Sequence, residues 1–350
     1  MFAPVKCILP MTIIRRQRTM PVAGKVLVRA GQKVGATDTI AESNLAPEYL
    51  LLDIARGLGV PADQTDRFIQ CQVGEQLAEK DIIAGPVGLA RRIVRAPRSG
   101  KVVVVEDGQM LLEISGQPFQ MKAGLPGEVI ELIPERGVVI ESAGALLQGV
   151  WGNGRVDSGQ LSVLAKTPDH EIKSSDLDVS SRGAVVLAGY CSDPEVFKTI
   201  EELALHGLIL GSMEARLVQR AAKSPVPIIV LEGFGRLPIG AASHKLMVSS
   251  ERRDVALNAE IRNVLTGVKP EVFFPAVVPS SVTPAPDFIS FDVNQKVRIV
   301  RPPNAGSVGV VEEIKGITAF PGGLRARAAL IRLENGENAI IPLPNLEVLV

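Results

Sequence analysis

The residue types that support hydrolytic or metal chemistry are few and scattered along this chain. Its three histidines, His170, His206 and His244, fall in a polar run, at a predicted helix end and in a loop. No Gly-x-Ser-x-Gly provides a nucleophile, and no His-Glu-x-x-His or Cys-x-x-Cys pair has the spacing of a zinc site. The pattern predicts no catalytic residue, no metal site and no cofactor, and it disfavours an enzyme.

The cysteines and the apolar runs bear on location. Cys7, Cys71 and Cys191 are odd in number and far apart, which is typical of a protein in the reducing cytoplasm. No run reaches the roughly 18 apolar residues of a membrane span, and the N-terminus lacks the pattern of a signal peptide. We therefore expect a cytoplasmic protein without a membrane partner.

A small-molecule site is predicted at the strand ends within residues 183–265. Short apolar strands at 184–188, 208–210 and 228–231 alternate with helical segments, and the first helix starts at Asp193-Pro194. This alternation predicts a small, doubly wound, Rossmann-like parallel sheet, in which ligands lie beyond the carboxyl ends of the strands. The candidate ligand-binding residues are Gly189, Ser192, Asp193, Gly211, Ser212, Glu232, Gly233 and Arg236.

The backbone N–H groups of these turns would face an anion, and Arg236 would neutralise it. Neither a Gly-x-Gly-x-x-Gly nor a P-loop is present, so no nucleotide is predicted. The alternative is that the glycines only open the turns of an interaction domain. A further helix is expected over Glu251–Val264.

Arginines form a second candidate site. The segment from Met1 to Thr37 has basic but no acidic residues, although the whole chain is neutral, with 38 basic and 38 acidic residues. Such a segment either contacts a polyanion or forms a solvated strand face. With further arginines near the C-terminus, the candidate nucleic-acid or partner contacts are Arg15, Arg16, Arg18, Arg298, Arg301, Arg325 and Arg327.

Two short patterns recur in the N-terminal region. Pro21-x-x-Gly-Lys-Val recurs at Pro97, and the stretch Gly31–Ala41 recurs as Gly74–Ala84. Duplicated strand–turn units of this length are expected to pack on one another. Asp107-Gly108, between two apolar strands, predicts a two-residue hairpin.

Between the repeats, residues 47–70 are expected to be helical. Leu50, Leu51, Ile54 and Leu58 recur there at helical spacing.

The order Pro-x-x-Gly-x-Val, Gly-x-x-Val and Asp-x-Ile-Ala resembles the barrel-sandwich hybrid of biotinyl and lipoyl carrier domains, over roughly residues 19–115. The resemblance implies a compact β-rich domain. The helical stretch stands where the carriers display their modifiable lysine, and Met121-Lys122-Ala123 lies beyond the second half of the pattern. We therefore expect no covalently attached cofactor.

The C-terminal region follows five prolines spread over residues 268–290, which predict an extended linker. The strand Asn294–Arg301, the run Gly306-x-x-Gly309-x-Val311 and the turn Asn335-Gly336 together resemble a KOW motif in an SH3-like barrel. Such barrels occur in bacterial transcription elongation factors and some ribosomal proteins, so the resemblance implies a nucleic-acid or protein partner. Residues 287–350 contain seven basic and seven acidic residues, which favours the protein.

These patterns predict a multidomain α+β protein. The expected parts are a barrel-sandwich-hybrid-like β domain at 1–142 with its helical insertion, a linker and β extension at 143–182, a Rossmann-like α/β domain at 183–265, a Pro-rich linker at 266–290 and an SH3-like β-barrel at 291–350. The favoured function is a non-enzymatic interaction or assembly protein, acting through a protein partner or self-assembly. The alternatives are a nucleic-acid- or transcription-associated protein and a regulator that senses an anionic small molecule.

Overall fold

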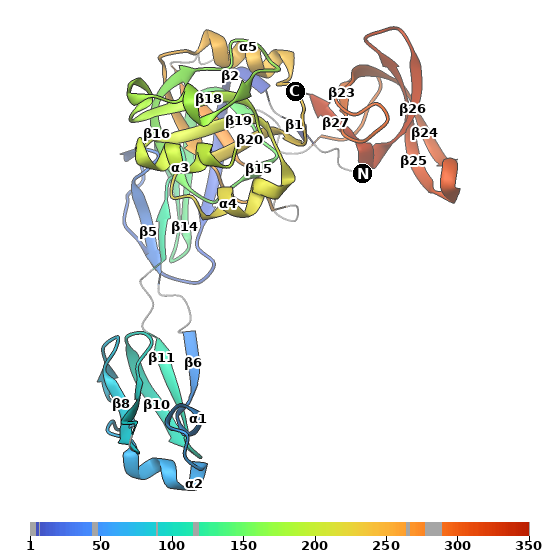
Figure 1. Cartoon of the computed structure of the whole chain (residues 1–350). Helices are drawn as coiled ribbons and strands as arrows, with labels where there is room; N and C mark the ends of the chain where they lie inside the picture. Colours follow the sequence, from blue (N-terminus) through green and yellow to red (C-terminus); the bar gives the residue numbers. More distant parts are fainter. Residues whose placement is uncertain are drawn as a thin grey trace.

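A computed structural model describes residues 5–6, 8–43, 48–88, 90–114, 119–263, 267–276 and 289–349. Over these residues the protein is β-rich, and its strands are divided among several sheets (Figure 1). The largest sheet has twelve strands. In spatial order they are β15 (Trp151–Gly152), β20 (Ile228–Phe234), β19 (Gly207–Met213), β18 (Ala184–Cys191), β16 (Val156–Val163), β21 (Asp254–Asn258), β22 (Glu271–Pro275), β14 (Gly137–Gln148), β13 (Gly127–Ile133) and β4 (Lys33–Val34), with β17 (Glu171–Ile172) beside β18 and β2 (Ile8–Thr19) beside β14.

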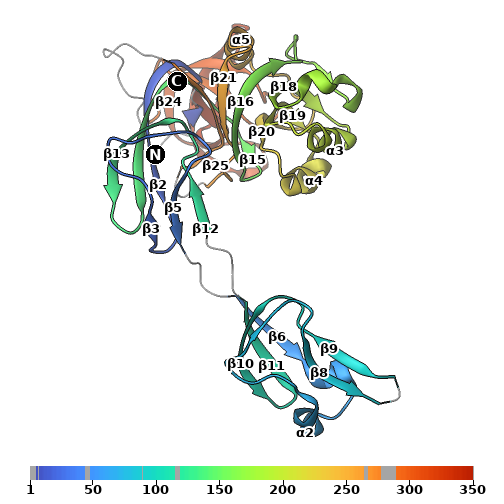
Figure 2. The same cartoon turned by 90° about the vertical axis from the view of Figure 1, so that its left-hand side faces the viewer.

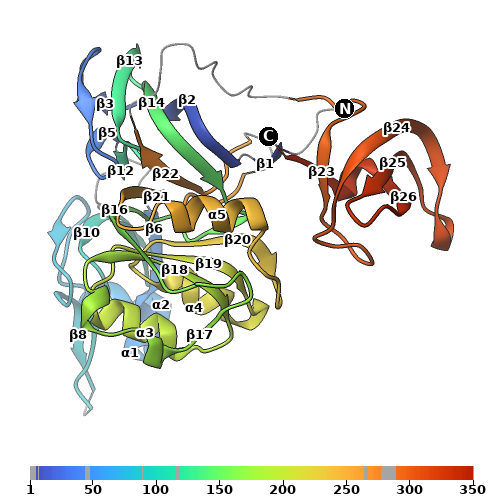
Figure 3. The same cartoon turned by 90° about the horizontal axis from the view of Figure 1, so that it is seen from above.

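Four neighbouring strands of this sheet, β16, β18, β19 and β20, are parallel. Helices α3 (Glu195–Glu202) and α4 (Val218–Lys223) pack on one face, where Phe197 and Ala221 enter a common core. Helix α5 (Ala241–Ser249) packs on the other face through Met247, and Figure 3 shows the strands between the two helical layers. The predicted alternation of strands and helices is therefore present.

The start of α3 follows the predicted chemistry. Oδ1 of Asp193 accepts a hydrogen bond from Glu195 N at 2.9 Å and so satisfies one donor of the first helical turn. The helix expected over Glu251–Val264 is wrong, because β21 occupies this stretch and pairs with β16 and β22. Val255 and Leu257 on one face and Ala256 on the other are all buried, and a strand covered on two faces shows no polar alternation that would reveal it.

Residues 143–182 also differ from the expected linker. Strand β14 continues to Gln148, and β16 lies in the middle of the large sheet. The polar run after it is packed, since Ile172 and Leu177 belong to the core under α3. Its short acidic side chains close local turns: Oδ2 of Asp176 accepts from Lys173 N at 2.8 Å.

The two repeated stretches lie in two separate lobes. In the integrated lobe (residues 12–43 and 119–142), Gly31 N donates to Val129 O at 2.7 Å. In the inserted lobe (residues 48–88 and 90–114), Gly74 N donates to Val102 O at 2.7 Å. Each lobe has its own hydrophobic core, so the expectation that the repeats pack on one another is wrong. Figures 1 and 2 show the inserted lobe set apart from the large sheet.

The smaller sheets belong to these lobes. The integrated lobe adds β3 (Lys25–Val26), β5 (Thr39–Ser43) and β12 (Phe119–Lys122) to its share of the large sheet. The inserted lobe contains β6 (Glu48–Asp53), β7 (Gln76–Leu77), β8 (Ile82–Val87), β9 (Arg92–Arg95), β10 (Gly100–Glu106) and β11 (Gln109–Ile114). The hairpin predicted at Asp107-Gly108 joins β10 to β11, and both residues have positive φ, 49° and 70°.

The helix expected at residues 47–70 begins later than predicted. Leu50 and Leu51 lie on β6, which pairs with β11, and helix α1 (Ile54–Leu58) starts only after it. Asp53 sets this boundary, because its Oδ1 accepts a hydrogen bond from Arg56 N at 2.9 Å. Helix α2 (Ala62–Thr65) follows as a single turn.

The C-terminal residues form a six-stranded sheet with its own core, which we call the C-terminal unit. Its strands, in spatial order, are β1 (Val5–Lys6), β27 (Leu346–Leu349), β23 (Lys296–Ile299), β24 (Val308–Ala319), β25 (Arg325–Leu333) and β26 (Asn338–Pro342). The predicted turn at Asn335-Gly336 joins β25 to β26, with Gly336 at φ 85°. The N-terminal strand β1 runs parallel to β27, a pairing that no sequence pattern predicted. Of the predicted Pro-rich linker, residues 277–288 lie outside the described chain, and 271–275 form β22.

Candidate functional site

The predicted ligand-binding residues gather at the carboxyl edge of β18, β19 and β20. Most of them serve packing there. Oγ of Ser212 donates to Leu237 O at 2.7 Å and accepts from Leu237 N at 3.1 Å, and the side chain is buried. A methyl group on Gly189 would collide with the carbonyl oxygen of His170, and one on Gly211 would lie 2.5 Å from Ile239 Cγ1. These glycines therefore allow close approach of neighbouring segments.

Ser192 and Arg236 share one carboxylate, which sequence reasoning missed. Oγ of Ser192 donates to Glu171 Oε1 at 2.7 Å, and Arg236 Nη2 lies 3.3 Å from Glu171 Oε2. The Arg236 guanidinium also lies 5.6 Å from the centre of the Tyr190 ring, over its face. Glu171 comes from the polar run expected as a linker, so no motif pointed to it.

The same edge contains a second hydrogen-bonded pair. The Tyr190 hydroxyl donates to Glu214 Oε1 at 3.1 Å, and Arg216 pairs with the other oxygen of Glu214. Burial, followed by this hydrogen bond, raises the pKa of Tyr190, and the hydrogen bond from Arg216 lowers the pKa of Glu214. Because donors and acceptors at this edge already satisfy one another, the edge offers little free hydrogen-bonding capacity to an anion.

The Glu232 side chain instead takes part in a buried ion-pair network with residues of the C-terminal unit. Its Oε1 accepts from Gly240 N at 3.0 Å, and its Oε2 pairs with Arg298 Nη1. Nη2 of Arg298 lies 3.0 Å from Glu347 Oε2, and Nζ of Lys269 lies 3.8 Å from Glu347 Oε1. Only 4% of the Glu232 side chain and 12% of the Arg298 side chain are exposed. Arg298, predicted as a nucleic-acid or partner contact, is therefore an internal contact.

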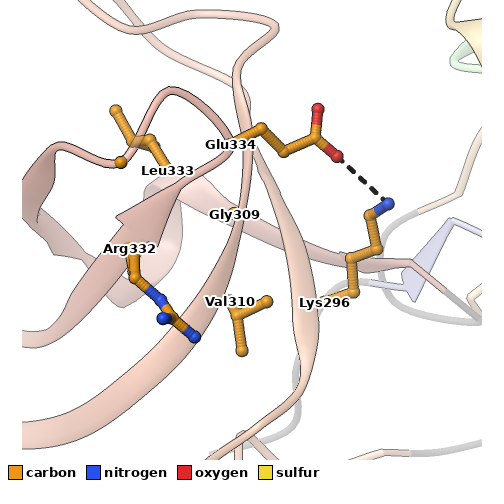
Figure 4. Close-up of a pocket in the computed structure, with 7 residues that line it drawn as sticks. Lys296, Gly309, Val310, Arg332, Leu333 and Glu334 are labelled. Atoms are coloured by element: carbon orange, nitrogen blue, oxygen red, sulfur yellow. Dashed lines mark ion pairs between the residues drawn. The ribbon is translucent and has the colours of Figure 1, made fainter.

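A cavity of about 660 Å³ adjoins this network. The loop Leu237–Gly240 and the first turn of α5 form one wall, and β23 with residues 300 and 305–308 forms the other. A smaller hollow of about 370 Å³ lies beside it on the C-terminal unit, and Val310, Arg332 and Leu333 are among the residues that line it (Figure 4). Lys296 and Glu334, an ion pair at 3.2 Å, line both.

The other predicted arginine contacts fall into two groups. The N-terminal arginines have carboxylate partners: Arg15 pairs with Glu141 at 2.7 Å, Arg16 with Glu271 at 2.7 Å, and Arg18 with Glu260. Within the described part of the chain, Arg301, Arg325 and Arg327 are exposed and have no such partner. The second group faces solvent without a competing carboxylate and is the better placed to contact a polyanion.

The outer face of the inserted lobe is a further candidate site that no prediction named. Leu51 on β6, Leu111 on β11 and Val104 on β10 lie directly opposite one another in the sheet. Leu51 is 60% exposed and Val104 41%, with Tyr49 53% exposed beside them. The Tyr49 hydroxyl donates to Glu113 Oε2 at 3.2 Å, which raises the pKa of Tyr49. We call Leu51, Leu111 and Val104 the apolar row.

The histidine and cysteine side chains of the described residues were the remaining candidates for metal or thiol chemistry. Across these residues no group of three or more His, Cys, Asp or Glu side chains is placed to hold a metal ion. His206 and His244 bind the backbone carbonyls of Ser158 and Ala165 at 2.7 and 2.8 Å. Burial raises the pKa of Cys191 to about 12, which keeps its thiol protonated. No helix of the described chain is long and apolar enough to cross a membrane.

Comparison with known proteins adds no relative: no protein-family description matches this chain, and no curated protein matches it.

Proposed function

We propose that this protein is a non-enzymatic interaction protein of the reducing cytoplasm, and that the outer face of its inserted lobe binds a partner protein. The observation that carries the proposal is the apolar row, in which Leu51 is 60% exposed. An exposed apolar patch with a polar rim is typical of a protein-binding surface. Buried, unpaired Cys71 and Cys191 agree with a reducing compartment.

The integrated lobe provides an internal comparison for this face. Strands β13 and β14 pair in the same way as β10 and β11, with a register shift at the same step. The counterpart of Leu51 is Gln17, that of Leu111 is Val139, and that of Val104 is Glu131. Gln17 and Glu131 are polar and exposed. The shared strand pairing therefore does not require apolar side chains at these positions.

The inserted lobe does not use the apolar row for contacts with the rest of the protein. Among the described residues, the hydrogen bonds and ion pairs of this lobe join its own residues. Its core, built around Ile83, Met110 and Leu112, is also separate. A lobe that folds around its own core and carries an apolar outer face is suited to present that face to another protein.

Charge around the row favours a different protein over a second copy. The positions flanking it on the same face are Asp53, Glu106 and Glu113 against a single Lys101. Two copies of this face would bring carboxylates together, whereas a partner with a basic rim would complement them. The resemblances to barrel-sandwich-hybrid and KOW-type modules, which serve large complexes, point to the same kind of role.

The test replaces two residues of the apolar row by their counterparts in the integrated lobe. Full-length Leu51→Gln/Val104→Glu should fold, because the integrated lobe carries these side chains at the same pairing positions. Val179→Gln, at a side chain that is 75% exposed elsewhere, is the matched control. The immobilised protein is incubated with lysate, with and without nuclease treatment, and bound proteins are identified and then purified for titration. Solution mass is measured in parallel.

We expect one purified partner to bind the wild type and Val179→Gln with the same Kd, and the double variant at least about tenfold more weakly. Equal binding by the double variant would overturn the proposed surface. A wild-type oligomer that the double variant abolishes would assign the surface to a second copy, and binding lost on nuclease treatment would support the nucleic-acid alternative.

A further inference from the structure

The cavity between the C-terminal unit and the loop before α5 has the features of a built binding site. Its walls are largely apolar, with Leu237 and Ile239 on one side and Ile299, Val300 and Leu333 on the other. At about 660 Å³ it falls in the size range of small-molecule pockets. The inserted lobe contributes no residue to it, so this site is independent of the proposed partner surface.

The polar end of the cavity is the N-terminus of α5. Gly240 is the N-cap residue, and no side chain caps the helix. Within the described chain, the backbone N–H groups of Ala241, Ala242 and Ser243 donate to no acceptor, and these three residues line the cavity. Unpaired N–H groups and the helix dipole together attract an anionic or strongly accepting group.

A buried hydroxyl at the same place supplies a second, independent observation. Ser243 is fully buried, lines the cavity, and its Oγ has no hydrogen-bond partner. A Cβ placed on Gly240 would lie 3.8 Å from this oxygen, so the hydroxyl lies beside the N-cap residue. A buried polar group without a partner is unusual in a folded protein, and a ligand in the cavity would satisfy it.

The charges around the cavity limit the ligand to a single negative charge. The charged lining residues in the described part of the chain are Glu232, Lys296, Arg298 and Glu334. Lys296 is paired with Glu334, and Arg298 is shared by Glu232 and Glu347. Among the lining residues that the structure describes, no lysine or arginine is thus left to balance a dianion, and Glu232 already accepts the Gly240 N–H. The helix end supplies about half a positive charge.

We propose that this cavity binds a monocarboxylate with an apolar body. The carboxylate oxygens accept hydrogen bonds from the first-turn N–H groups of α5 and from the Ser243 hydroxyl. The apolar body lies between Ile239 and Ile299. Such a ligand contacts the α/β region and the C-terminal unit at once, and its binding stabilises their contact.

The test titrates octanoate and 4-phenylbutyrate into the full-length protein by calorimetry, with octanol and inorganic phosphate as comparison probes. Ser243→Ala removes only a hydroxyl that has no partner, so this variant should fold. Ala242→Glu places a fixed carboxylate on the exposed first turn, where it suits the helix dipole. Ser249→Ala, at the other end of α5, is the matched control.

We expect saturable binding of at least one carboxylate by the wild type and by Ser249→Ala. Ser243→Ala should raise its Kd about tenfold, and Ala242→Glu should raise it further. Octanol and phosphate should bind at least about tenfold more weakly than the carboxylate. No saturable binding of either carboxylate, equal affinity for octanol, or an unchanged Kd in Ser243→Ala would each overturn the proposal.

Discussion

Replacing Arg298 by alanine tests how the C-terminal unit is held against the large sheet. The change removes the guanidinium that contacts both Glu232 and Glu347, whose side chains are 4% and 12% exposed. Breaking a buried ion pair destabilises a protein by about 3–5 kcal/mol, because the remaining charge stays out of water. Gly240 N still donates to Glu232 and Lys269 still faces Glu347, so we expect the lower end, about 3 kcal/mol.

Two variants with the same replacement at position 298, Arg298→Met and Glu232→Gln/Arg298→Met, separate the loss of the ion pair from the burial of an unpaired charge. In Glu232→Gln/Arg298→Met both charges are absent, while the glutamine oxygen can still accept the Gly240 N–H. A neutral, well-packed replacement of a buried pair is often close to the wild type in stability. We therefore expect the double variant to be about 1–2 kcal/mol more stable than Arg298→Met, which keeps the Glu232 charge without its partner.

Scanning calorimetry at neutral pH measures the unfolding transition that involves the C-terminal unit. At about 2–4 °C per kcal/mol, Arg298→Ala should lower its Tm by about 6–12 °C. Arg15→Ala is the control, because its pair with Glu141 is 61% and 34% exposed, and exposed pairs contribute less than about 1 kcal/mol. If Arg298→Ala changes the Tm as little as Arg15→Ala does, the reasoning from burial is refuted.

Three further predictions rest on single positions. Gly309→Val should destabilise the C-terminal unit by about 1–3 kcal/mol in urea unfolding, because a Cβ there would lie 2.5 Å from Arg332 O. Gly316→Val is the control and should leave the free energy of unfolding nearly unchanged, because no atom lies within 4 Å of a Cβ at that position. Hydrogen bonds from the backbone N–H groups of Ser174 and Glu195 lower the pKa of Asp193. The wild type should therefore have a higher Tm than Asp193→Asn above the pKa of an ordinary aspartate, and this difference should disappear as the pH falls through the lowered pKa of the folded state. A difference in Tm that grows in acid would contradict this. The Cys191 thiol, buried and protonated, should resist iodoacetamide in the native protein and react in urea, as read by peptide mass; rapid native labelling would contradict the burial.

The features that the sequence predicted well depend on a few consecutive residues. Asp107-Gly108 forms a hairpin because glycine and aspartate tolerate positive φ, and Asp193 starts a helix because its carboxylate reaches an N–H two residues away. Both are decided within four residues of chain. The same local logic is why the strands around Val185 and Ile209, with their intervening helix, were predicted in the right order.

The features that it predicted poorly depend on partners far along the chain. Val255 and Leu257 suit a helix or a strand, and only the pairing of β21 with β16 and β22 decides between them. Glu232 and Arg298 were assigned to a ligand site and to a polyanion site, but the fold joins them across 66 positions. An ion pair of this kind leaves no spacing in the sequence that a motif could match.

The repeats show most clearly which positions the fold constrains. The sequence aligns Pro97–Val102 with Pro21–Val26, yet in strand pairing Gly100 and Val102 correspond to Gly127 and Val129. The two lobes share residue types where backbone segments lie close together. Each lobe has a glycine where a Cβ would collide with the neighbouring strand, and each has an aspartate, Asp38 or Asp81, that accepts a backbone N–H at 2.8 or 2.7 Å.

On the outer faces of the two lobes, the side chains at matching positions are mostly different. The backbone hydrogen bonds between the strands form whichever side chain points to solvent. Glu113 keeps its counterpart in Glu141, but Leu51 and Tyr49 stand where the integrated lobe has Gln17 and Arg15. The exposed Leu51 is not part of the hydrophobic core of its lobe. The positions that folding leaves free are therefore where a binding function is best sought, and in this protein they coincide with the apolar row.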